Sequence, residues 1–449
     1  MQSLRQHQVD ALEFATRLGS CAMFMEPGLG KTRVALEWLK AVGSTRALVV
    51  APLSVTQGVW PDQIETWAPD TTYELVRGSV ADRIRILKSS PASILIINYD
   101  LLRWLYELMR TDKTIRFDSI VLDESSRIKT PGSATSKAAR AIAPTSRNRL
   151  IMTGTPSGNS LADLWAQVTF IDGGKRLGKN ISAFRQKYCT PNMRHAYIKW
   201  DVVKPDDVMK DSADVCFVRR AEECIDMPEE IVNQIFVRLP HEALRLHDSI
   251  KSDLVLDGDP IANADVAIGK MQQVVGGFVY GSEAARIPGT RRQRTRIHDA
   301  KVEALRTLVD ELNGEPLLVI YRFDEEREMI RDALGESIPS LDGSTHDSKS
   351  IIKQWNQGKF PILLGQPQSM AHGLNMQSGG YAICFYTLPW SLELYIQSIG
   401  RLARQGQKSK HVVVHHLIAR QTIDEYISRA LIKKNNVQET LFDFITERE

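Results

Sequence analysis

The sequence has few cysteines, no long apolar run and no strong excess of charge. Its 449 residues include five cysteines, none in the C-x-x-C spacing of a structural zinc site. We therefore expect reduced thiols that mostly pack in the interior, with no disulfide framework. No run approaches the roughly 18 unbroken apolar residues of a membrane span, and the start, "MQSLRQHQVDALEF", lacks the pattern of a secretory signal. We expect a cytoplasmic protein with no membrane partner.

The net charge of +3 is too small to indicate a nucleic-acid partner by itself. One stretch, "RIPGTRRQRTRIHD", is locally basic; its arginines are Arg286, Arg291, Arg292, Arg294 and Arg296. Two interpretations of it stay open, a solvated loop and a segment that contacts phosphate or a protein.

Short apolar runs alternate with amphipathic segments. Those of the first half are "RALVVAP", "SILIINY", "FDSIVLDE" and "RLIMTGT", and those of the second half are "PLLVIYRF", "FPILLGQ", "YAICFYT" and "HVVVHHLI". Such runs are typical of buried parallel strands, and the alternation predicts open α/β sheets. We expect one α/β lobe over 1–172, another over 301–449, and mainly helical material over 173–300, with a helix near 241–257.

A glycine-rich turn, "MEPGLGKT" at residues 25–32, resembles a phosphate-binding loop. Gly28 and Gly30 permit close backbone approach, and the N–H groups of such a turn and of the following helix hold phosphate oxygens. Lys31 can reach the β- and γ-phosphates, and Thr32 can ligate Mg²⁺. The full pattern has glycine where this chain has Met25, so a chance turn is the alternative.

A pair of carboxylates, Asp123 and Glu124, ends the apolar run of "FDSIVLDESSRIK". An aspartate at the end of a strand holds Mg²⁺ in P-loop enzymes, and the next carboxylate can activate a water molecule. The alternative is an acidic turn after a buried strand. The phosphate loop upstream in the same pattern favours the catalytic interpretation.

The second lobe contains "YIQSIGRLARQGQ", in which Gln397, Arg401 and Arg404 have the spacing of one helix face. Two guanidinium groups on that face can stabilise a transferring phosphoryl group as arginine fingers. A basic surface helix is the alternative.

In this order, the motifs resemble those of superfamily-two helicase-like ATPases, specifically the Swi/Snf-type DNA translocases of the small bacteriophage and bacterial branch. "LRQHQVDAL" resembles the family's adenine-reading motif, with Gln8 at its centre, and "LIMTGTPSGNSLADLW" resembles the motif that couples the ATP and DNA sites. "LDGSTHDSKSIIKQWNQG" is typical of the second lobe. Ser125 and Ser126 stand where relatives have Ala-His.

The resemblance implies two RecA-like lobes with helical material between them. It implies that ATP binds to Gln8, Gly28, Leu29, Gly30, Lys31 and Thr32, with Mg²⁺ on Thr32 and, through water, Asp123. Glu124, Gln397, Arg401 and Arg404 would join Lys31 in catalysis. Ser54 in "VVAPLSVTQGVW", Tyr99 in "INYD" and Asn375 in "SMAHGLNMQSGG", where Gly373 also matches, would contact DNA.

The implied activity is ATP-dependent movement on DNA, with duplex favoured and single strands possible, in the host cytoplasm if a phage encodes the chain. A strand-separating or branch-migrating helicase is an open alternative. A nucleotide-dependent binding module with little turnover is another, and RNA is a lesser possibility as substrate. Trp355 and Trp390 are expected to pack in the core.

Overall fold

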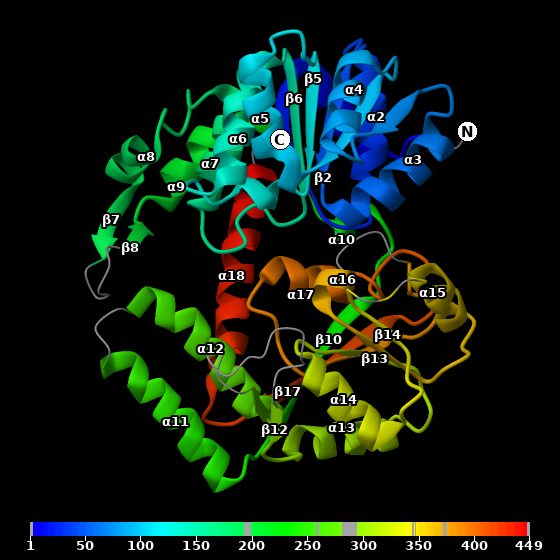
Figure 1. Ribbon diagram of the computed structural model, residues 1–449, viewed down its shortest axis with the longest axis vertical. Coiled ribbons are helices and arrows are strands. Elements are labelled where there is room, and N and C mark those ends of the chain that lie inside the picture. The colour runs from blue at the N-terminus through cyan, green and yellow to red at the C-terminus, as the bar shows by residue number, and fades with distance from the viewer. Residues whose placement is uncertain are drawn as a thin grey trace. The chain divides into compact units, whose positions relative to one another are not determined.

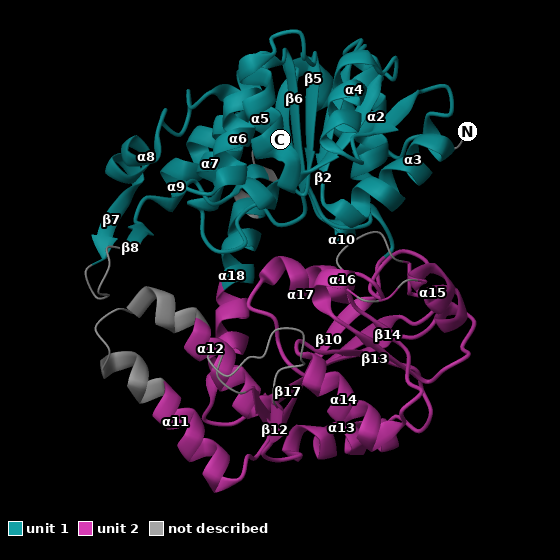
Figure 2. Cartoon of the chain, viewed as in Figure 1, with its two compact units in different colours: residues 1–192, 200–226, 434–449 teal, residues 193–199, 227–433 magenta. Residues whose placement is uncertain are grey.

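The structure is a computed structural model that describes residues 3–192, 199–256, 260–280, 294–343, 345, 347–370 and 375–446. The chain forms two compact units, each described here by itself (Figures 1 and 2). Unit 1 comprises residues 1–192, 200–226 and 434–449, and unit 2 comprises residues 193–199 and 227–433.

Unit 1 is built around a seven-stranded sheet in the order β3-β4-β2-β5-β6-β1-β9. Every pairing in this sheet is parallel. The strands are β1 (Ser20–Met25), β2 (Ala47–Ala51), β3 (Tyr73–Leu75), β4 (Ile94–Asn98), β5 (Ser119–Asp123), β6 (Asn148–Thr153) and β9 (Cys216–Arg219). Parallel pairing brings the carboxyl ends of these strands to one edge of the sheet, where open α/β sheets bind ligands.

Helices cover the sheet because its strands are apolar on both faces. One face packs on α5, α6, α7 and the end of α18, through side chains such as Leu105, Ile142, Leu164 and Phe442. The helices of unit 1 are α1 (Gln6–Leu18), α2 (Lys31–Ala41), α3 (Trp60–Trp67), α4 (Val80–Ser89), α5 (Leu102–Thr111), α6 (Ala134–Ile142), α7 (Asp163–Asp172), α8 (Ile181–Tyr188), α9 (Pro205–Ser212) and α10 (Ala221–Cys224). A small sheet pairs β7 (Cys189–Asn192) with β8 (Lys199–Val202).

Unit 2 contains a six-stranded sheet in the order β10-β17-β16-β13-β15-β14, also parallel at every pairing. Its strands are β10 (Glu229–Val237), β13 (Leu317–Ile320), β14 (Ser340–Leu341), β15 (Ile362–Gly365), β16 (Ala382–Phe385) and β17 (His411–Ala419). A separate antiparallel pair joins β11 (Phe278–Tyr280) to β12 (Arg294–Arg296).

Two apolar clusters lie on the two faces of this second sheet. One contains side chains of α12, α13 and α14, such as Leu305 and Met329, and the other contains side chains of α15, α17 and α18, such as Trp355 and Leu392. The helices are α11 (His241–Leu256), α12 (Pro260–Gly276), α13 (Ala300–Glu311), α14 (Asp324–Leu334), α15 (Ser348–Asn356), α16 (Pro367–Met370), α17 (Leu392–Ile399) and α18 (Ile423–Thr446). Helix α18 begins in unit 2 and ends in unit 1.

The predicted α/β class with two parallel sheets is confirmed, and all eight apolar runs form strands. The units differ from the expected boundaries of 1–172, 173–300 and 301–449. Residues of the middle segment join both sheets, because β9 adds a strand beside β1 and β10 adds one beside β17. Trp355 is fully buried as expected, whereas Trp390 is half-buried against the ring of Tyr426.

Candidate active site

The glycine-rich turn lies between β1, which ends at Met25, and α2, which begins at Lys31. Gly28 and Gly30 have φ angles of 90° and 78°, a left-handed conformation that glycine adopts without strain. A Cβ atom at position 30 would lie only 2.3 Å from Nε2 of Gln8. The positive φ therefore favours glycine at position 30, and a larger residue there would have to displace the Gln8 side chain.

Gln8 of α1 lies directly against this turn. Its Nε2 donates to the carbonyl of Leu29 at 3.2 Å, and its Oε1 accepts from the backbone N–H of Arg5 at 3.1 Å. A ring nitrogen of His7 also lies 3.2 Å from the Leu29 carbonyl oxygen. The structure thus brings the predicted adenine-reading glutamine onto the phosphate loop, and its contact with adenine stays a prediction.

Lys31 opens α2 and folds back over the turn. Its Nζ donates to the carbonyl oxygens of Met25 at 2.7 Å and Glu26 at 3.2 Å. Thr32 lies in the first helical turn, where the free backbone N–H groups form the positive end of the helix dipole. Phosphate oxygens need cationic, hydroxyl and N–H donors. Residues 28–32 supply all three kinds, so they fit the phosphates of a nucleoside triphosphate.

Asp123 ends β5 at the same edge of the sheet and is 6% exposed. Its Oδ2 accepts a hydrogen bond of 2.9 Å from Nε1 of the buried Trp60. Burial raises the pKa of the Asp123 carboxyl, while the Trp60 hydrogen bond and the charge of Lys31 act in the opposite direction. A carboxylate in these surroundings suits a divalent cation, which would offset its desolvation.

Glu124 has φ 56° and ψ 57°, a left-handed conformation that is uncommon for residues other than glycine. Its Oε2 accepts from the hydroxyl of Thr153 at 3.3 Å, and that hydroxyl accepts from the N–H of Thr155 at 3.1 Å. A Cβ atom at position 154 would lie 3.0 Å from Cδ of Pro27. The loop of residues 153–156 therefore contacts both the turn of Asp123 and Glu124, here called the acidic turn, and the glycine-rich turn of residues 25–32, here called the phosphate loop.

Sequence reasoning missed Trp60, which contacts Asp123 at the candidate site. It begins α3, after a short π-helical segment at Val55–Val59, and no motif spacing links it to Asp123. Irregular helical turns of this kind are frequent at functional sites, but the irregularity is visible only in the structure.

The three predicted DNA contacts have different surroundings. Ser54 is exposed beyond the carboxyl end of β2, and Asn375 is exposed in unit 2, where its carbonyl accepts from Nδ2 of Asn356 at 2.7 Å. Tyr99 is only 6% exposed, and its hydroxyl donates to the carbonyl of Asp123 at 2.9 Å. Each DNA contact stays a prediction, and Tyr99 also supports the acidic turn. Gly373 lies outside the described residues.

The predicted helix through Gln397, Arg401 and Arg404 is wrong in its extent. Helix α17 ends at Ile399 with Gly400 as its C-cap, so both arginines lie in the turns that follow. Arg401 is 6% exposed and its Nε donates to the carbonyl of Gln397 at 2.8 Å. Burial lowers the pKa of Arg404. These residues belong to unit 2, and their catalytic roles stay predictions.

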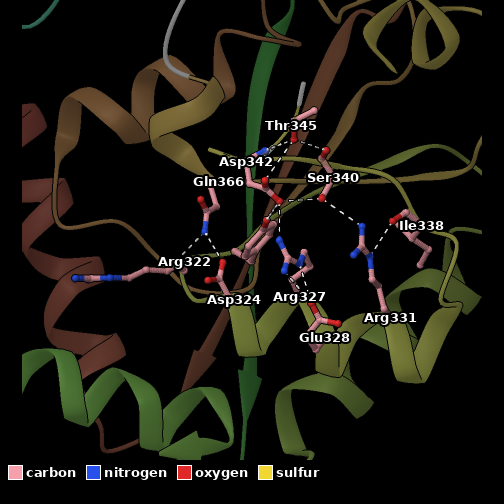
Figure 3. A network of polar contacts seen from close by, with 11 residues as sticks. Arg322, Asp324, Arg327, Glu328, Arg331, Ile338, Ser340, Asp342, Thr345 and Gln366 are labelled. Carbon is pink, nitrogen blue, oxygen red and sulfur yellow. Dashed lines mark hydrogen bonds and ion pairs between the residues drawn. The ribbon is translucent and has the colours of Figure 1, made fainter. Parts of the chain in front are cut away.

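A polar network lies at the carboxyl ends of β13, β14 and β15 (Figure 3). At its centre, Oδ2 of Asp342 accepts from Nη1 of Arg327 at 2.7 Å and from the hydroxyl groups of Ser340 and Tyr321 at 2.9 and 3.0 Å. Nε2 of Gln366 lies 3.4 Å from Oδ1 of Asp324. Arg327 also pairs with Glu328 at 2.8 Å, so one guanidinium group joins two carboxylates at the edge of the second sheet.

The described part of the arginine-rich stretch is paired within unit 2. Arg294 and Arg296 both contact Glu325, at 2.5 and 2.8 Å, and Arg296 also contacts Asp332 at 2.5 Å. This part of the stretch therefore has a structural role. Arg286, Arg291 and Arg292 lie outside the described residues.

Two further expectations concern the whole chain. Cys21, Cys216 and Cys384 are buried, and Cys189 and Cys224 are half-buried; all five are free thiols, in agreement with the expected packing role. Within the part of the chain that the structure describes, no helix is both long enough and apolar enough to cross a membrane.

Two family models and a phage protein match this chain. Residues 7–270 match the SNF2-related domain, and residues 300–406 match the helicase conserved C-terminal domain. The chain is 34% identical to protein p41 of Acyrthosiphon pisum secondary endosymbiont phage 1, over 93% of each chain.

Longer relatives and one solved structure also match. An uncharacterized ATP-dependent helicase of Mycoplasma genitalium, MG018, is 24% identical over 93% of this chain and 40% of its own length. The DNA repair and recombination protein RAD54B of Gallus gallus is 24% identical over 98% of this chain and 54% of its own length. This chain thus spans about half or less of those two relatives.

The solved SWI2/SNF2 ATPase core of Sulfolobus solfataricus in complex with dsDNA matches with a TM-score of 0.47 and 22% identity, over 98% of this chain and 93% of that one. The family match over more than half of the chain and the identity with the phage protein are sufficient for assignment. This chain belongs to the SNF2-related family of helicase-like proteins.

Proposed function

We propose that this protein is an ATP-driven motor that moves along DNA, most readily along duplex DNA. One observation carries the ATPase part of the proposal. Three segments meet at one edge of the sheet of unit 1: the phosphate loop after β1, the turn of Asp123 and Glu124 after β5, and the 153–156 loop after β6. This is the edge where parallel α/β sheets bind ligands.

In the proposed reaction, Lys31 and the N–H groups of residues 28–32 hold the phosphates of ATP. Thr32 and, through water, Asp123 would hold Mg²⁺, which would supply positive charge against the phosphates. Glu124 orients the attacking water and accepts its proton. Arg401 and Arg404 of unit 2, with Gln397 beside them, stabilise the charge that develops on the transferring phosphoryl group.

The DNA part of the proposal rests on the family. Relatives include an ATP-dependent helicase and a DNA repair and recombination protein. We propose that Ser54, Tyr99 and Asn375 act at or near bound DNA, and that the steps of ATP hydrolysis change the grip of the protein on it. Ser54 and Asn375 are exposed, as a direct contact requires, whereas the buried Tyr99 would act through its hydrogen bond to the carbonyl of Asp123.

The test is ATP turnover with no nucleic acid, single-stranded DNA, duplex DNA, forked DNA and RNA. Lys31→Ala and Glu124→Gln should abolish turnover in a folded protein. Lys40→Ala, which removes a lysine from the exposed end of the same helix, should keep it. Full activity in Lys31→Ala would refute the assignment.

The nucleic acids separate the remaining alternatives. Stimulation by duplex DNA, without release of a strand from a fork, supports translocation on duplex DNA. Stimulation mainly by single strands or forks, with strand release, supports an unwinding helicase. No stimulated turnover with any of them supports a nucleotide-dependent binding module.

A further inference from the structure

A buried chain of hydrogen bonds connects helix α7 to the acidic turn. The hydroxyl of Ser125 donates to Oε1 of Gln167 at 2.8 Å. The amide of Gln167 donates in turn to the carbonyl of Pro156 at 2.8 Å. One glutamine side chain thus joins the residue after Glu124 to the end of the 153–156 loop.

The link lies in the protein interior. Ser125 and Gln167 are both 0% exposed, so neither side chain can exchange its partner for water. Gln167 stands on a helix whose neighbouring side chains, Leu164 and Val168, belong to the apolar core. A buried polar group is costly unless it is hydrogen-bonded, and here the donor and acceptor ends of one amide are both satisfied.

Glu124 needs such support. Its left-handed backbone conformation persists only if the surrounding structure determines it. Thr153 donates a hydrogen bond of 3.3 Å to the Glu124 carboxylate. The Ser125–Gln167–Pro156 chain is a second connection between the same two segments, and it acts on the backbone rather than on the carboxylate.

We propose that Gln167 is a positioning residue that holds the Glu124 turn in register with the 153–156 loop. The inference deepens the proposed function and rests on it, because the role of Glu124 belongs to that proposal. Gln167 does not reach the reacting atoms. Its loss should therefore lower kcat through Glu124 and leave ATP affinity, which depends on the phosphate loop, unchanged.

Three variants cut the link in different ways: Gln167→Leu, Ser125→Ala and the double variant. Ser125→Ala leaves Oε1 of Gln167 without its partner, and Gln167→Leu leaves both the Ser125 hydroxyl and the Pro156 carbonyl without theirs, so each should lower the thermal midpoint Tm. The double variant should recover part of the Tm lost in Gln167→Leu, because only the Pro156 carbonyl then lacks its partner. Thr169→Val is the matched control, because Thr169 is a buried polar residue of the same helix whose hydroxyl has no hydrogen-bond partner among the described residues.

We expect kcat to fall roughly tenfold in both single variants, a typical coupling between contacting side chains. The KM for ATP and the affinity for labelled nucleotide should change by less than about twofold. The double variant should be as slow as either single variant, because all three cut the same link. Thr169→Val should keep the wild-type kcat.

The outcome that overturns the inference is a wild-type kcat in either single variant, or recovery of kcat together with Tm in the double variant. In both cases Gln167 would be only a packing residue. Ser125→Ala changes the core least, so the test does not depend on the folding of Gln167→Leu. Lys31→Ala is measured in parallel: a wild-type rate no higher than that of Lys31→Ala would refute the proposed function itself.

Discussion

The indole Nε1 of Trp60 donates a 2.9 Å hydrogen bond to Oδ2 of Asp123, and both side chains are buried. This contact places a neutral donor behind the carboxylate proposed to hold Mg²⁺. Such outer partners orient ligands, and their loss commonly lowers metal affinity or activity about 10–100-fold.

Trp60→Phe keeps most of the ring and removes the donor. We expect ATPase activity to need roughly tenfold more Mg²⁺ for half-saturation. The control is Trp67→Phe, which removes a similar hydrogen bond, 3.1 Å to Oε1 of Gln63, from the same helix. An unchanged Mg²⁺ dependence in Trp60→Phe would show that the indole does not tune this site.

Arg404→Ala tests the contribution of unit 2 to hydrolysis. Arginine fingers contribute on the order of 10³ or more to kcat, so the variant should lose about that factor while ATP still binds. Arg306→Ala, which removes an exposed arginine of the same unit, should have little effect. Wild-type turnover in Arg404→Ala would mean that Arg404 takes no part in the reaction.

Gly30→Ala should weaken nucleotide binding, because the added methyl group would displace the Gln8 side chain from the turn. The new methyl group would combine a positive φ of 78° with a 2.3 Å approach to Gln8 Nε2. Gly43→Ala is the matched control, since φ there is 65° but no described atom lies within 4 Å of the added Cβ. Both variants carry the cost of a positive φ, about 1–2 kcal/mol. A difference between their affinities for labelled ATP therefore measures the effect of the contact with Gln8. Equal ATP affinity in the two variants would show that this contact does not affect binding.

Much of the candidate nucleotide site could be predicted from the sequence because its residues are adjacent in the chain. Gly28 to Thr32 form one turn, and Asp123 and Glu124 follow one apolar strand. The partners of these residues could not be predicted, because Trp60 and Gln167 reach the acidic turn only through the fold. Their separations in sequence from their partners, 63 and 42 residues, follow no motif.

The end of helix α17 was predicted wrongly for a local reason. The spacing of Gln397, Arg401 and Arg404 fits a helix face, but Gly400 caps the helix after Ile399. Gly400 has a φ of −63°, so this helix end does not depend on a conformation that only glycine adopts. Residue spacing alone carries no information on where the helix stops.

Lys301→Met should strongly destabilise unit 2. Nζ of Lys301 lies 2.7 Å from Oδ2 of Asp424, with the two side chains 0% and 1% exposed, and it also donates to the carbonyl of Tyr386 at 2.8 Å. Removing the cation leaves an unpaired buried carboxylate, at a cost of about 3–5 kcal/mol.

The second variant, Lys301→Met with Asp424→Asn, removes both charges and should recover much of the loss in thermal unfolding. Lys88→Met breaks a pair of similar length, 2.6 Å to Asp112, in which the lysine side chain is 45% exposed. That control should change stability by no more than about 1 kcal/mol. If Lys301→Met lowers stability no more than Lys88→Met does, the buried pair of Lys301 and Asp424 contributes little to stability.

Asp118 gives a pH-dependent prediction. It precedes β5, and its carboxylate accepts from the backbone N–H groups of Thr45 at 2.7 Å and Arg46 at 2.9 Å, and from the hydroxyl of Ser44. Burial alone would raise the pKa of this carboxyl, but the hydrogen bonds hold it below the ordinary value of 3.8.

Because the folded-state pKa is the lower one, the charged form stabilises the fold above the unfolded-state pKa. That stabilisation is lost as the pH falls through the folded-state pKa. Asp118→Asn should therefore lower the free energy of unfolding by about 1 kcal/mol at neutral pH, a small value because the side chain is partly exposed. The difference should be constant between roughly pH 5 and 7 and shrink below about pH 4. Thermal unfolding of the wild type and Asp118→Asn across this pH range measures the difference in free energy of unfolding. A difference that grows towards low pH would show that the Asp118 pKa is raised, not lowered, by folding.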